Sequence, residues 1–246
     1  MDNVPVALTI AGFDPSGGAG VLADVRTFAE FGFSAGAAVT SLTFQNDREF
    51  FGAVHQAGAT VRSQVESLTA QFSIACAKTG MLPTAEVVRE VARLFRDEKL
   101  PPPVVDPVLV SSSGKPLMEE AAISVLRDEL FPVSGLVTPN IPEAETLTGM
   151  QITSEAHMLE AAAQIRNMGA RAVLIKGGHL SGDLSIDVLD DDGEIAVFRG
   201  KRIQGAGLHG SGCVLSAAIA AGLGKGMTLK NAVAQAKSFV LEQLRQ

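Results

Sequence analysis

Short, continuously apolar runs alternate with longer amphipathic stretches along almost the whole chain. Continuous apolar runs, as opposed to runs that alternate with polar residues, are typical of strands buried on both faces of a parallel sheet. The predicted strands are Val6–Ile10, Ala37–Leu42, Ile74–Ala77, Val104–Val105, Leu136–Thr138 and Ala172–Ile175. This order predicts an α/β fold, a doubly wound three-layer sandwich in which right-handed crossovers place helices on both faces of the sheet.

The amphipathic stretches between these runs predict helices with recognisable ends. Gly32 is a good terminating glycine for the first of them, and Thr84 and Ser154 are placed to cap two others. The predicted helices are Leu22–Phe31, Val61–Phe72, Ala85–Glu98, Glu119–Leu130, Glu155–Met168, about Cys213–Leu223 and Leu229–Leu244.

Two further runs, Ser185–Leu189 and Glu194–Arg199, flank the turn sequence Asp191-Asp192-Gly193 and predict an antiparallel hairpin at the sheet edge. No internal repeat or low-complexity linker is visible, and Pro101-Pro102-Pro103 fits a loop between a helix and a strand. We therefore expect one domain covering residues 1–246.

Composition excludes several classes of protein. With 46% hydrophobic and 19% charged residues the chain is globular, and a net charge of −7 without a block of Lys or Arg argues against nucleic acid or an anionic membrane as partner. Two distant cysteines fit a reducing compartment, and the apolar run Val6–Ala11 is too short for a signal peptide core or a membrane span. The expected location is the cytoplasm.

Two glycine-rich segments imitate the dinucleotide-binding fingerprint: Gly18-Ala19-Gly20-Val21-Leu22-Ala23 and Gly205-Ala206-Gly207-Leu208-His209-Gly210. That fingerprint needs an acidic residue at the end of the next strand to hold the ribose. Ala37–Leu42 carries no acid, and no βαβ unit follows the second segment. A nicotinamide oxidoreductase is therefore a remote alternative.

A more informative segment is His209-Gly210-Ser211-Gly212-Cys213, in which a glycine-rich turn leads into an Ala-rich helix. Free N–H groups at a helix start, with glycines that admit close approach, form an anion hole. The alternative is an ordinary helix start with a buried, inert cysteine.

Polar side chains also follow three of the predicted strands: Asp106, then Asn140 with Glu143, then Lys176. Ligands of open α/β sheets bind beyond the carboxyl ends of the strands, so these residues should converge beside the anion hole. Two carboxylates, a lysine and an anion hole suit a Mg²⁺–phosphate site better than a zinc site. Each residue taken alone could equally be a helix cap or a surface charge.

A series of short motifs runs along nearly the whole chain: Ala7–Gly20 with Ala23-Asp24, Gln45-Asn46, Lys78–Leu82, Val105–Val108, Thr138–Asn140, Lys176–His179 and His209–Cys213. With these motifs in this order, the chain resembles the hydroxymethylpyrimidine/phosphomethylpyrimidine kinases of thiamine biosynthesis, members of the ribokinase-like superfamily.

This resemblance implies a ribokinase-like sheet of about eight or nine strands, a homodimer, and ATP-dependent phosphorylation of 4-amino-5-hydroxymethyl-2-methylpyrimidine and then of its monophosphate. It implies that Asp24 and Gln45 hydrogen-bond the pyrimidine in a pocket also formed by Gly12 and Met81. Asn140 and Lys176 would bind ATP phosphates, and Asp106 and Glu143 would hold Mg²⁺ through water. Gly210, Ser211, Gly212 and Cys213 would form the catalytic anion hole.

Cys213 stands where most ribokinase-like enzymes have Asp, so we expect it to act as the general base. A helix N-terminus should lower its pKa by about one unit from ~8.5. The chain departs from the family at Phe13, Leu208, Ser211 and Asp47-Arg48-Glu49. Phe13 and Leu208 are expected to narrow or dry the pocket, which leaves a pyridoxal or pyridoxine kinase open. A third hypothesis is a non-catalytic ligand-binding protein.

Overall fold

The computed structural model describes residues 4–46, 48–97, 100–111, 113–178, 184–201 and 209–244. Its strands form one nine-stranded sheet in the order β3-β2-β1-β4-β5-β6-β7-β8-β9. The bounds of the strands are β1 Val6–Phe13, β2 Ser34–Gln45, β3 Phe50–His55, β4 Ile74–Thr79, β5 Val104–Val105, β6 Leu136–Val137, β7 Ala172–Ile175, β8 Leu184–Asp191 and β9 Glu194–Lys201. From β2 to β7 all neighbours pair in parallel, and antiparallel strands flank this block on both sides.

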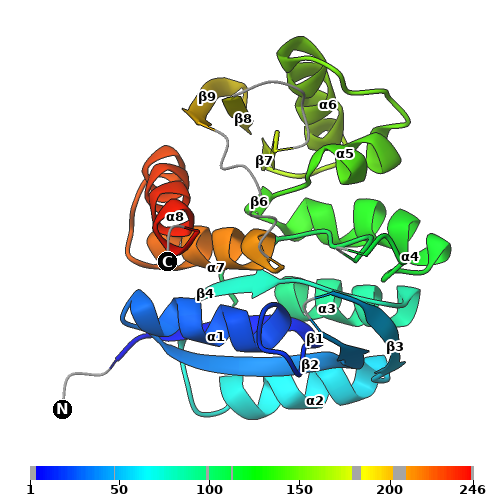
Figure 1. The fold of residues 1–246 in the computed structure, drawn as a ribbon. Coiled ribbons are helices and arrows are strands. Elements are labelled where there is room, and N and C mark those ends of the chain that lie inside the picture. Colours follow the sequence, from blue (N-terminus) through cyan, green and yellow to red (C-terminus); the bar gives the residue numbers. More distant parts are fainter. Residues whose placement is uncertain are drawn as a thin grey trace.

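Helices cover both faces of the sheet and make three layers (Figure 1). Helices α1, α7 and α8 lie on one face, and α2 to α6 lie on the other. Their bounds are α1 Gly20–Glu30, α2 Gly58–Thr69, α3 Ala85–Asp97, α4 Glu120–Val125, α5 Ile141–Thr148, α6 Glu155–Asn167, α7 Ser211–Gly224 and α8 Leu229–Gln243. None of the described helices has the length and hydropathy needed to cross a bilayer.

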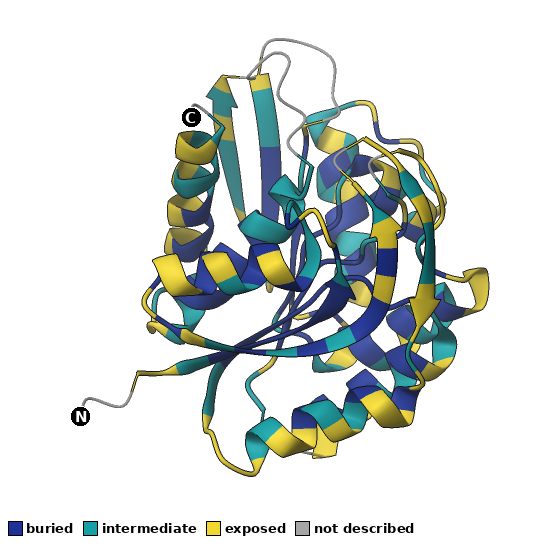
Figure 2. Ribbon diagram, turned by 60° about the horizontal axis from the view of Figure 1, so that its bottom comes forward, coloured by how far each residue is buried: buried dark blue, intermediate teal, exposed yellow. Residues whose placement is uncertain are grey.

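Two hydrophobic cores lie between these layers. One packs the sheet against α2, α3, α5 and α6 and includes Leu8, Ile10 and Val105; the other packs it against α1, α7 and α8 and includes Phe28 and Leu136. Figure 2 shows the buried strands at the centre of the molecule and exposed residues along the outer helix faces. Continuous apolar runs therefore form buried strands, as predicted.

The expected mainly parallel three-layer sandwich is confirmed. Gly32 has a left-handed φ of 78° after α1, and the Ser154 side chain accepts a hydrogen bond from the His157 N–H at the start of α6. The β8–β9 hairpin turns at Asp192 and Gly193, both with positive φ, as an Asp-Gly hairpin requires.

Three local features differ from the sequence-based expectation. The edge strand β3 and the short helix α5 were not expected. The predicted helix Glu119–Leu130 is divided into α4, a π-helical segment at Leu126–Leu130 and a 3₁₀ turn at Phe131–Val133. Pro132 lies within that last turn, and proline cannot donate the backbone hydrogen bond that an α-helix needs.

Candidate active site

A cavity of about 490 Å³ opens at the carboxyl ends of the parallel strands. Its wall contains eleven of the twelve residues proposed from the sequence: Gly12, Gln45, Met81, Asp106, Asn140, Glu143, Lys176, Gly210, Ser211, Gly212 and Cys213. They arrive from strands far apart in the chain, because every parallel strand ends at the same edge. The expected convergence of the strand ends with the start of α7 is therefore observed.

One end of the cavity carries two carboxylates and an ammonium group. Lys176 Nζ lies 2.9 Å from Asp106 Oδ1, and Ser216 on α7 donates to Asp106 Oδ2 at 3.4 Å. Glu143 is buried at the same end. Burial, together with the Asp106 carboxylate, raises the pKa of Glu143, against the opposing influence of Lys176. The Asp106 and Glu143 carboxylates also raise the pKa of Lys176 despite its burial.

Asn140 and Glu143 also form the start of α5. The Asn140 side chain accepts from the Glu143 N–H at 2.9 Å, and Glu143 Oε2 accepts from the Asn140 N–H at 2.8 Å. This reciprocal arrangement is a capping box, which satisfies two backbone donors that the helix itself leaves unpaired. Each of these two side chains therefore has a structural role while it lines the cavity.

The opposite wall is built from main chain. Gly210, with φ of 83°, caps α7, and a Cβ added there would lie 2.0 Å from the carbonyl oxygen of Gly18. Gly20, with φ of 59°, starts α1, and a Cβ there would lie 2.1 Å from the carbonyl oxygen of Gly12. Only glycine permits these approaches, which bring the N-termini of α1 and α7 together at Cys213. The backbone N–H of Gly20 favours the thiolate form of Cys213.

The predicted lowering of the Cys213 pKa is wrong. Burial raises the pKa of this thiol to about 11, and the Asp24 and Asp106 carboxylates act in the same direction. Lys78 and the Gly20 N–H favour the thiolate but do not outweigh them. With nothing bound, Cys213 is therefore a neutral thiol at pH 7, and not the partly ionised base that the helix start alone suggested.

The predicted contact between Asp24 and a pyrimidine is also not supported. Asp24 is fully buried beneath the cavity and is not part of its wall. Its carboxylate accepts from Lys78 Nζ at 2.8 and 2.9 Å and from Thr9 Oγ1 at 2.6 Å. Burial disfavours the charged form of Lys78, but Asp24 outweighs it and the pKa of Lys78 is raised. Asp24 is thus engaged within the protein.

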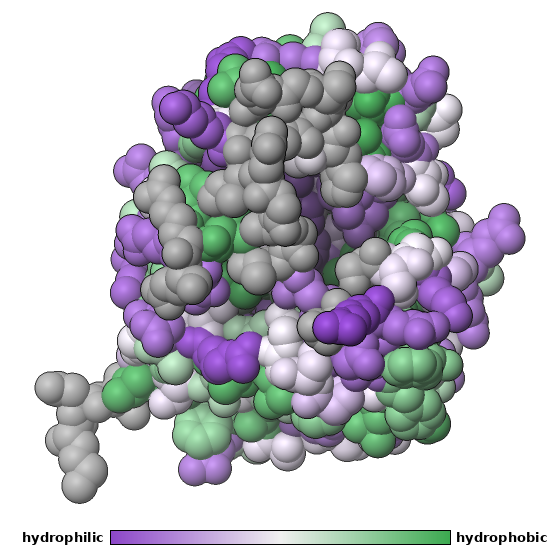
Figure 3. Space-filling view, in the orientation of Figure 1, coloured by the Kyte–Doolittle hydropathy of each residue, from purple (hydrophilic) through white to green (hydrophobic). Residues whose placement is uncertain are grey.

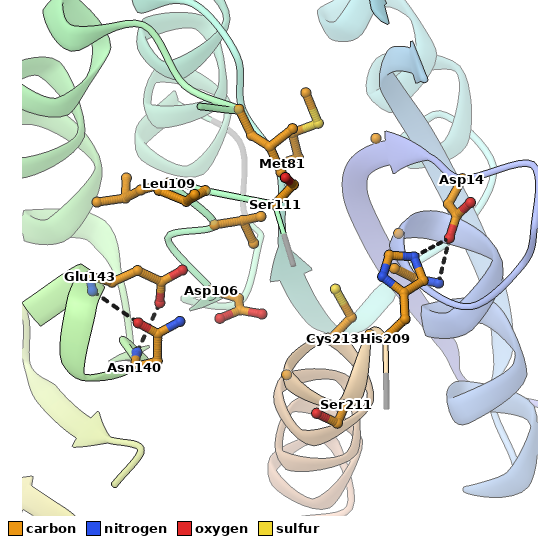
Figure 4. Close-up of a pocket in the computed structure, with 18 of the residues that line it drawn as sticks. Asp14, Met81, Asp106, Leu109, Ser111, Asn140, Glu143, His209, Ser211 and Cys213 are labelled. Atoms are coloured by element: carbon orange, nitrogen blue, oxygen red, sulfur yellow. Dashed lines mark hydrogen bonds and ion pairs between the residues drawn. The ribbon is translucent and has the colours of Figure 1, made fainter. Parts of the chain in front are cut away.

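Sequence reasoning missed Lys78 as the partner of Asp24, although it had singled out Lys78-Thr79-Gly80-Met81-Leu82. It also missed the pair formed by Asp14 and His209, whose Oδ2 and Nε2 atoms are 2.8 Å apart. Figure 4 shows this pair on one side of the cavity and Asn140 with Glu143 on the other, with Cys213 and Asp106 between them.

The remaining predicted ligand contacts lie on the side of β1, β2 and β4. Gln45 is half-buried, and Met81 packs against Gly12, where an added Cβ would lie 3.0 Å from the Met81 sulfur. Phe13 was expected to narrow the pocket, but it is not among the lining residues; its carbonyl oxygen accepts from Thr43. Leu208 and Asp47 lie outside the described residues.

The phosphomethylpyrimidine kinase family model matches residues 14–246. The chain belongs to this family. A hydroxymethylpyrimidine/phosphomethylpyrimidine kinase of Aquifex aeolicus is 38% identical over 240 residues, which cover 98% of this chain and 94% of that one. The bifunctional thiamine biosynthesis protein ThiED of Geobacter sulfurreducens is 41% identical over 238 residues, but the chain, 97% of which is aligned, spans only 49% of that protein.

Solved structures of two kinases resemble this fold over almost its whole length. The ADP complex of Bacillus subtilis pyridoxal kinase has a TM-score of 0.88 at 35% identity and covers 96% of this chain and 90% of that one. A phosphomethylpyrimidine kinase of Clostridium difficile has a TM-score of 0.86 at 32% identity and covers 98% and 99%. The ribokinase-like fold is thus shared with kinases of two substrate classes.

Proposed function

We propose that this family member transfers phosphate from ATP to the hydroxymethyl group of 4-amino-5-hydroxymethyl-2-methylpyrimidine, and then to the resulting monophosphate, in thiamine biosynthesis. The observation that carries the proposal is that Gln45, which suits a polar acceptor ring, and Lys176, which suits an anion, line the same cavity as the start of α7. Phosphoryl transfer depends mostly on positioning and charge stabilisation, which this arrangement supplies.

Asn140, Lys176 and the N–H groups of Gly210 to Cys213 would bind the ATP phosphates. Asp106 and Glu143 fit a Mg²⁺ ion, because carboxylate oxygens are the ligands it prefers. Among the described residues no group of three or more His, Cys, Asp or Glu could hold a metal on its own, so water and phosphate oxygens would complete the shell. When bound, Mg²⁺ would neutralise charge on the transferred phosphate.

For the first acceptor, which is an alcohol, we propose that Cys213 accepts the hydroxyl proton. Its sulfur lies at the junction of the two ends of the cavity, which is where the reacting atoms must meet. Since its pKa is about 11 with nothing bound, this role requires bound ligands to favour the thiolate. If they do not, the anion hole is the main catalytic element.

Pyridoxal kinase is the second candidate function, because the likeness to the Bacillus subtilis enzyme is as close in fold as the likeness to a phosphomethylpyrimidine kinase. Gln45 favours the pyrimidine, since its amide both donates and accepts hydrogen bonds, as an aminopyrimidine edge requires. A non-catalytic binding protein is disfavoured by the complete set of Asp106, Lys176 and Cys213 at one cavity.

We also propose that residues 1–246 act as one cytoplasmic domain that forms a homodimer. Exposed apolar side chains gather on the β2–β3 hairpin: Leu42, Phe44, Phe51 and Val54 are 45–65% exposed. Figure 3 shows apolar surface at the lower right, where Figure 1 places β3. Such a cluster is typical of an interaction surface. Sedimentation should give a dimer for the parent chain and a monomer for Phe51→Ser.

The experiment that tests the proposed function is an ATP-consumption assay with hydroxymethylpyrimidine, its monophosphate and pyridoxal, each with and without Mg²⁺. Mg²⁺-dependent turnover of both pyrimidines is expected, with less turnover of pyridoxal. If only pyridoxal is turned over, pyridoxal kinase replaces the proposed function. If none of the three compounds is turned over, the remaining hypothesis is a non-catalytic ligand-binding protein.

A further inference from the structure

The two acceptors of the proposed function differ in charge. In both steps an acceptor oxygen forms a bond to the γ-phosphorus of ATP, and the bond to the departing ADP breaks, its electron pair leaving with ADP. The alcohol must also lose a proton, whereas the phosphate oxygen of the monophosphate is already ionised. A phosphate monoester carries about −1.5 to −2 charge at pH 7. The second acceptor therefore brings negative charge into a cavity that already contains Asp106 and Glu143.

The basic side chains near the cavity are mostly committed elsewhere. Lys176 pairs with Asp106 in the cavity wall. Lys78 pairs with Asp24, and both side chains are fully buried. Arg26 donates to the carbonyl oxygen of Gly17 and does not line the cavity. Within the described part of the wall, the one other basic side chain is His209.

His209 lies on the acceptor side, directly before the anion hole. Its ring packs on the backbone of Gly18, where an added Cβ would lie 2.6 Å from His209 Cδ2. The side chain is 14% exposed, so the ring is held in the wall and still reaches the cavity. Figure 4 shows the ring between Asp14 and Cys213.

Asp14 fixes the orientation of that ring. Its carboxylate accepts from the Ser16 N–H at 2.9 Å, the Ser16 hydroxyl at 2.8 Å and the Ala19 N–H at 2.9 Å, besides His209. Although burial opposes it, these hydrogen bonds hold the pKa of Asp14 below its usual range. An ionised carboxylate only accepts, so His209 Nε2 donates to it. The pair is built into the loop that ends at α1.

We infer that His209, oriented by Asp14, recognises the phosphate of the monophosphate acceptor and thereby governs the second phosphorylation more than the first. This inference rests on the proposed function. An imidazole held by the Asp14 carboxylate in the cavity wall can donate a hydrogen bond to a substrate phosphate, which the second acceptor has and the first lacks. It therefore distinguishes an acceptor that bears a phosphate from one that does not.

The test compares the parent chain with His209→Gln, Asp14→Asn and the control His157→Gln, a histidine outside the cavity. The ratio of kcat/KM for the monophosphate to kcat/KM for hydroxymethylpyrimidine is measured at saturating Mg·ATP. For His209→Gln we expect kcat/KM to fall for both acceptors, but to fall at least tenfold more for the monophosphate, so that the ratio falls tenfold or more. This is the range expected for the loss of a hydrogen bond to a charged group. Asp14→Asn lowers the ratio in the same direction, His209→Lys restores part of it, and the control leaves it unchanged.

Calorimetry without ATP provides a second measurement that does not depend on turnover. The affinity of His209→Gln for the monophosphate should fall at least tenfold, and its affinity for hydroxymethylpyrimidine should fall less. Equal losses for the two acceptors, or an unchanged ratio, would overturn the inference and leave His209 as a structural residue. A parent chain that neither binds nor phosphorylates either pyrimidine would instead overturn the proposed function.

Discussion

Two of the Asp–Lys pairs among the described residues have nearly equal geometry, although one is fully buried outside the cavity wall and the other is part of that wall. Asp24 and Lys78 are 2.8 Å apart and both side chains are 0% exposed. Asp106 and Lys176 are 2.9 Å apart, with side-chain exposures of 3% and 15%. Thr9 also donates to Asp24 in the first pair, which is not part of the cavity wall, whereas both residues of the second pair line the cavity. The distance between the charges does not distinguish the pairs; their access to a ligand does.

This difference teaches how a site residue should be recognised. When one partner of a fully buried pair is removed, the remaining charge can reach neither water nor a ligand. The free energy of unfolding is therefore expected to fall. In the pair that lines the cavity, water or a ligand can replace the lost partner. The main expected effect is therefore a lower kcat. Variants at each pair, and at the thiol that both pairs influence, test this division.

Cys213 lies where the two pairs meet, since Lys78, Asp24 and Asp106 all act on its thiol. If it accepts the hydroxyl proton, Cys213→Ala should lower kcat for the alcohol acceptor by about 10²–10⁴ while KM for ATP is unchanged. The monophosphate acceptor, which loses no proton, should be affected less. Steady-state kinetics with both acceptors checks this, with Cys76→Ala as the matched control. Near-normal kcat with the alcohol would refute the base role.

The sealed pair should control stability. Lys78→Met leaves the Asp24 carboxylate buried without its partner, and we expect the free energy of unfolding to fall by roughly 3–5 kcal/mol. The double variant Asp24→Asn with Lys78→Met should recover part of that loss. Urea unfolding followed by circular dichroism measures both. A loss below about 1 kcal/mol in the single variant would mean that the interior pair is dispensable.

The matching change in the cavity should have the opposite outcome. Lys176→Met removes a cation that would stabilise the transferred phosphate, so kcat should fall by about 10²–10³. Its free energy of unfolding should fall less than that of Lys78→Met, because water in the cavity can solvate Asp106. Parallel kinetics and urea unfolding of the two Lys→Met variants separate these effects. If Lys78→Met and Lys176→Met lower the free energy of unfolding equally, access to a ligand does not distinguish the two pairs.

The same division separates the two residues that were expected to bind the ring. Gln45 lines the cavity, so Gln45→Met should weaken the binding of hydroxymethylpyrimidine by about 1–3 kcal/mol, the penalty for an unpaired polar group, and should affect pyridoxal less. Calorimetry with both compounds measures the difference. A similar loss for pyridoxal would make Gln45 a structural residue.

The two cysteines provide the smallest and simplest test. Cys213 lines the cavity with a pKa of about 11, and Cys76 is buried with a pKa raised by burial to about 12. Below these values the thiolate fraction grows tenfold per pH unit, so labelling of Cys213 by iodoacetamide should accelerate about tenfold per unit between pH 7 and 10. Mass spectrometry should find Cys213 labelled before Cys76, with ATP protecting it. Rapid labelling at pH 7 would contradict the raised pKa.

Most of the fold could be predicted because the strands are buried on both faces and therefore read as continuous apolar runs. The edge strand β3 escaped prediction because it is partly exposed and lacks a continuous buried apolar run; Phe51, for example, is 65% exposed. Helix α5, which has eight residues and a proline in its first turn, was not predicted. Its capping box, Asn140 with Glu143 three residues later, was visible in the sequence and could have revealed it.

The candidate site was predictable where a side chain directly follows a strand, as Asp106 and Lys176 do. It was not predictable where the outcome depends on a distant partner. Asp24 and Lys78 are separated by 54 residues, and no local pattern shows that they pair. The raised pKa of Cys213 was missed for the same reason, since burial and neighbouring carboxylates from other elements outweigh the helix N-terminus.

The glycine contacts around Cys213 have a consequence for how substrate preference can change in this lineage. Where Gly20 faces the carbonyl of Gly12, and Gly210 that of Gly18, any side chain would collide with main chain. An exchange at Gly20 or Gly210 therefore cannot reshape that wall without moving the main chain. New acceptors must be accommodated through the positions that already carry side chains, such as Gln45, and the place where phosphate is transferred stays constant while the ring beside it varies.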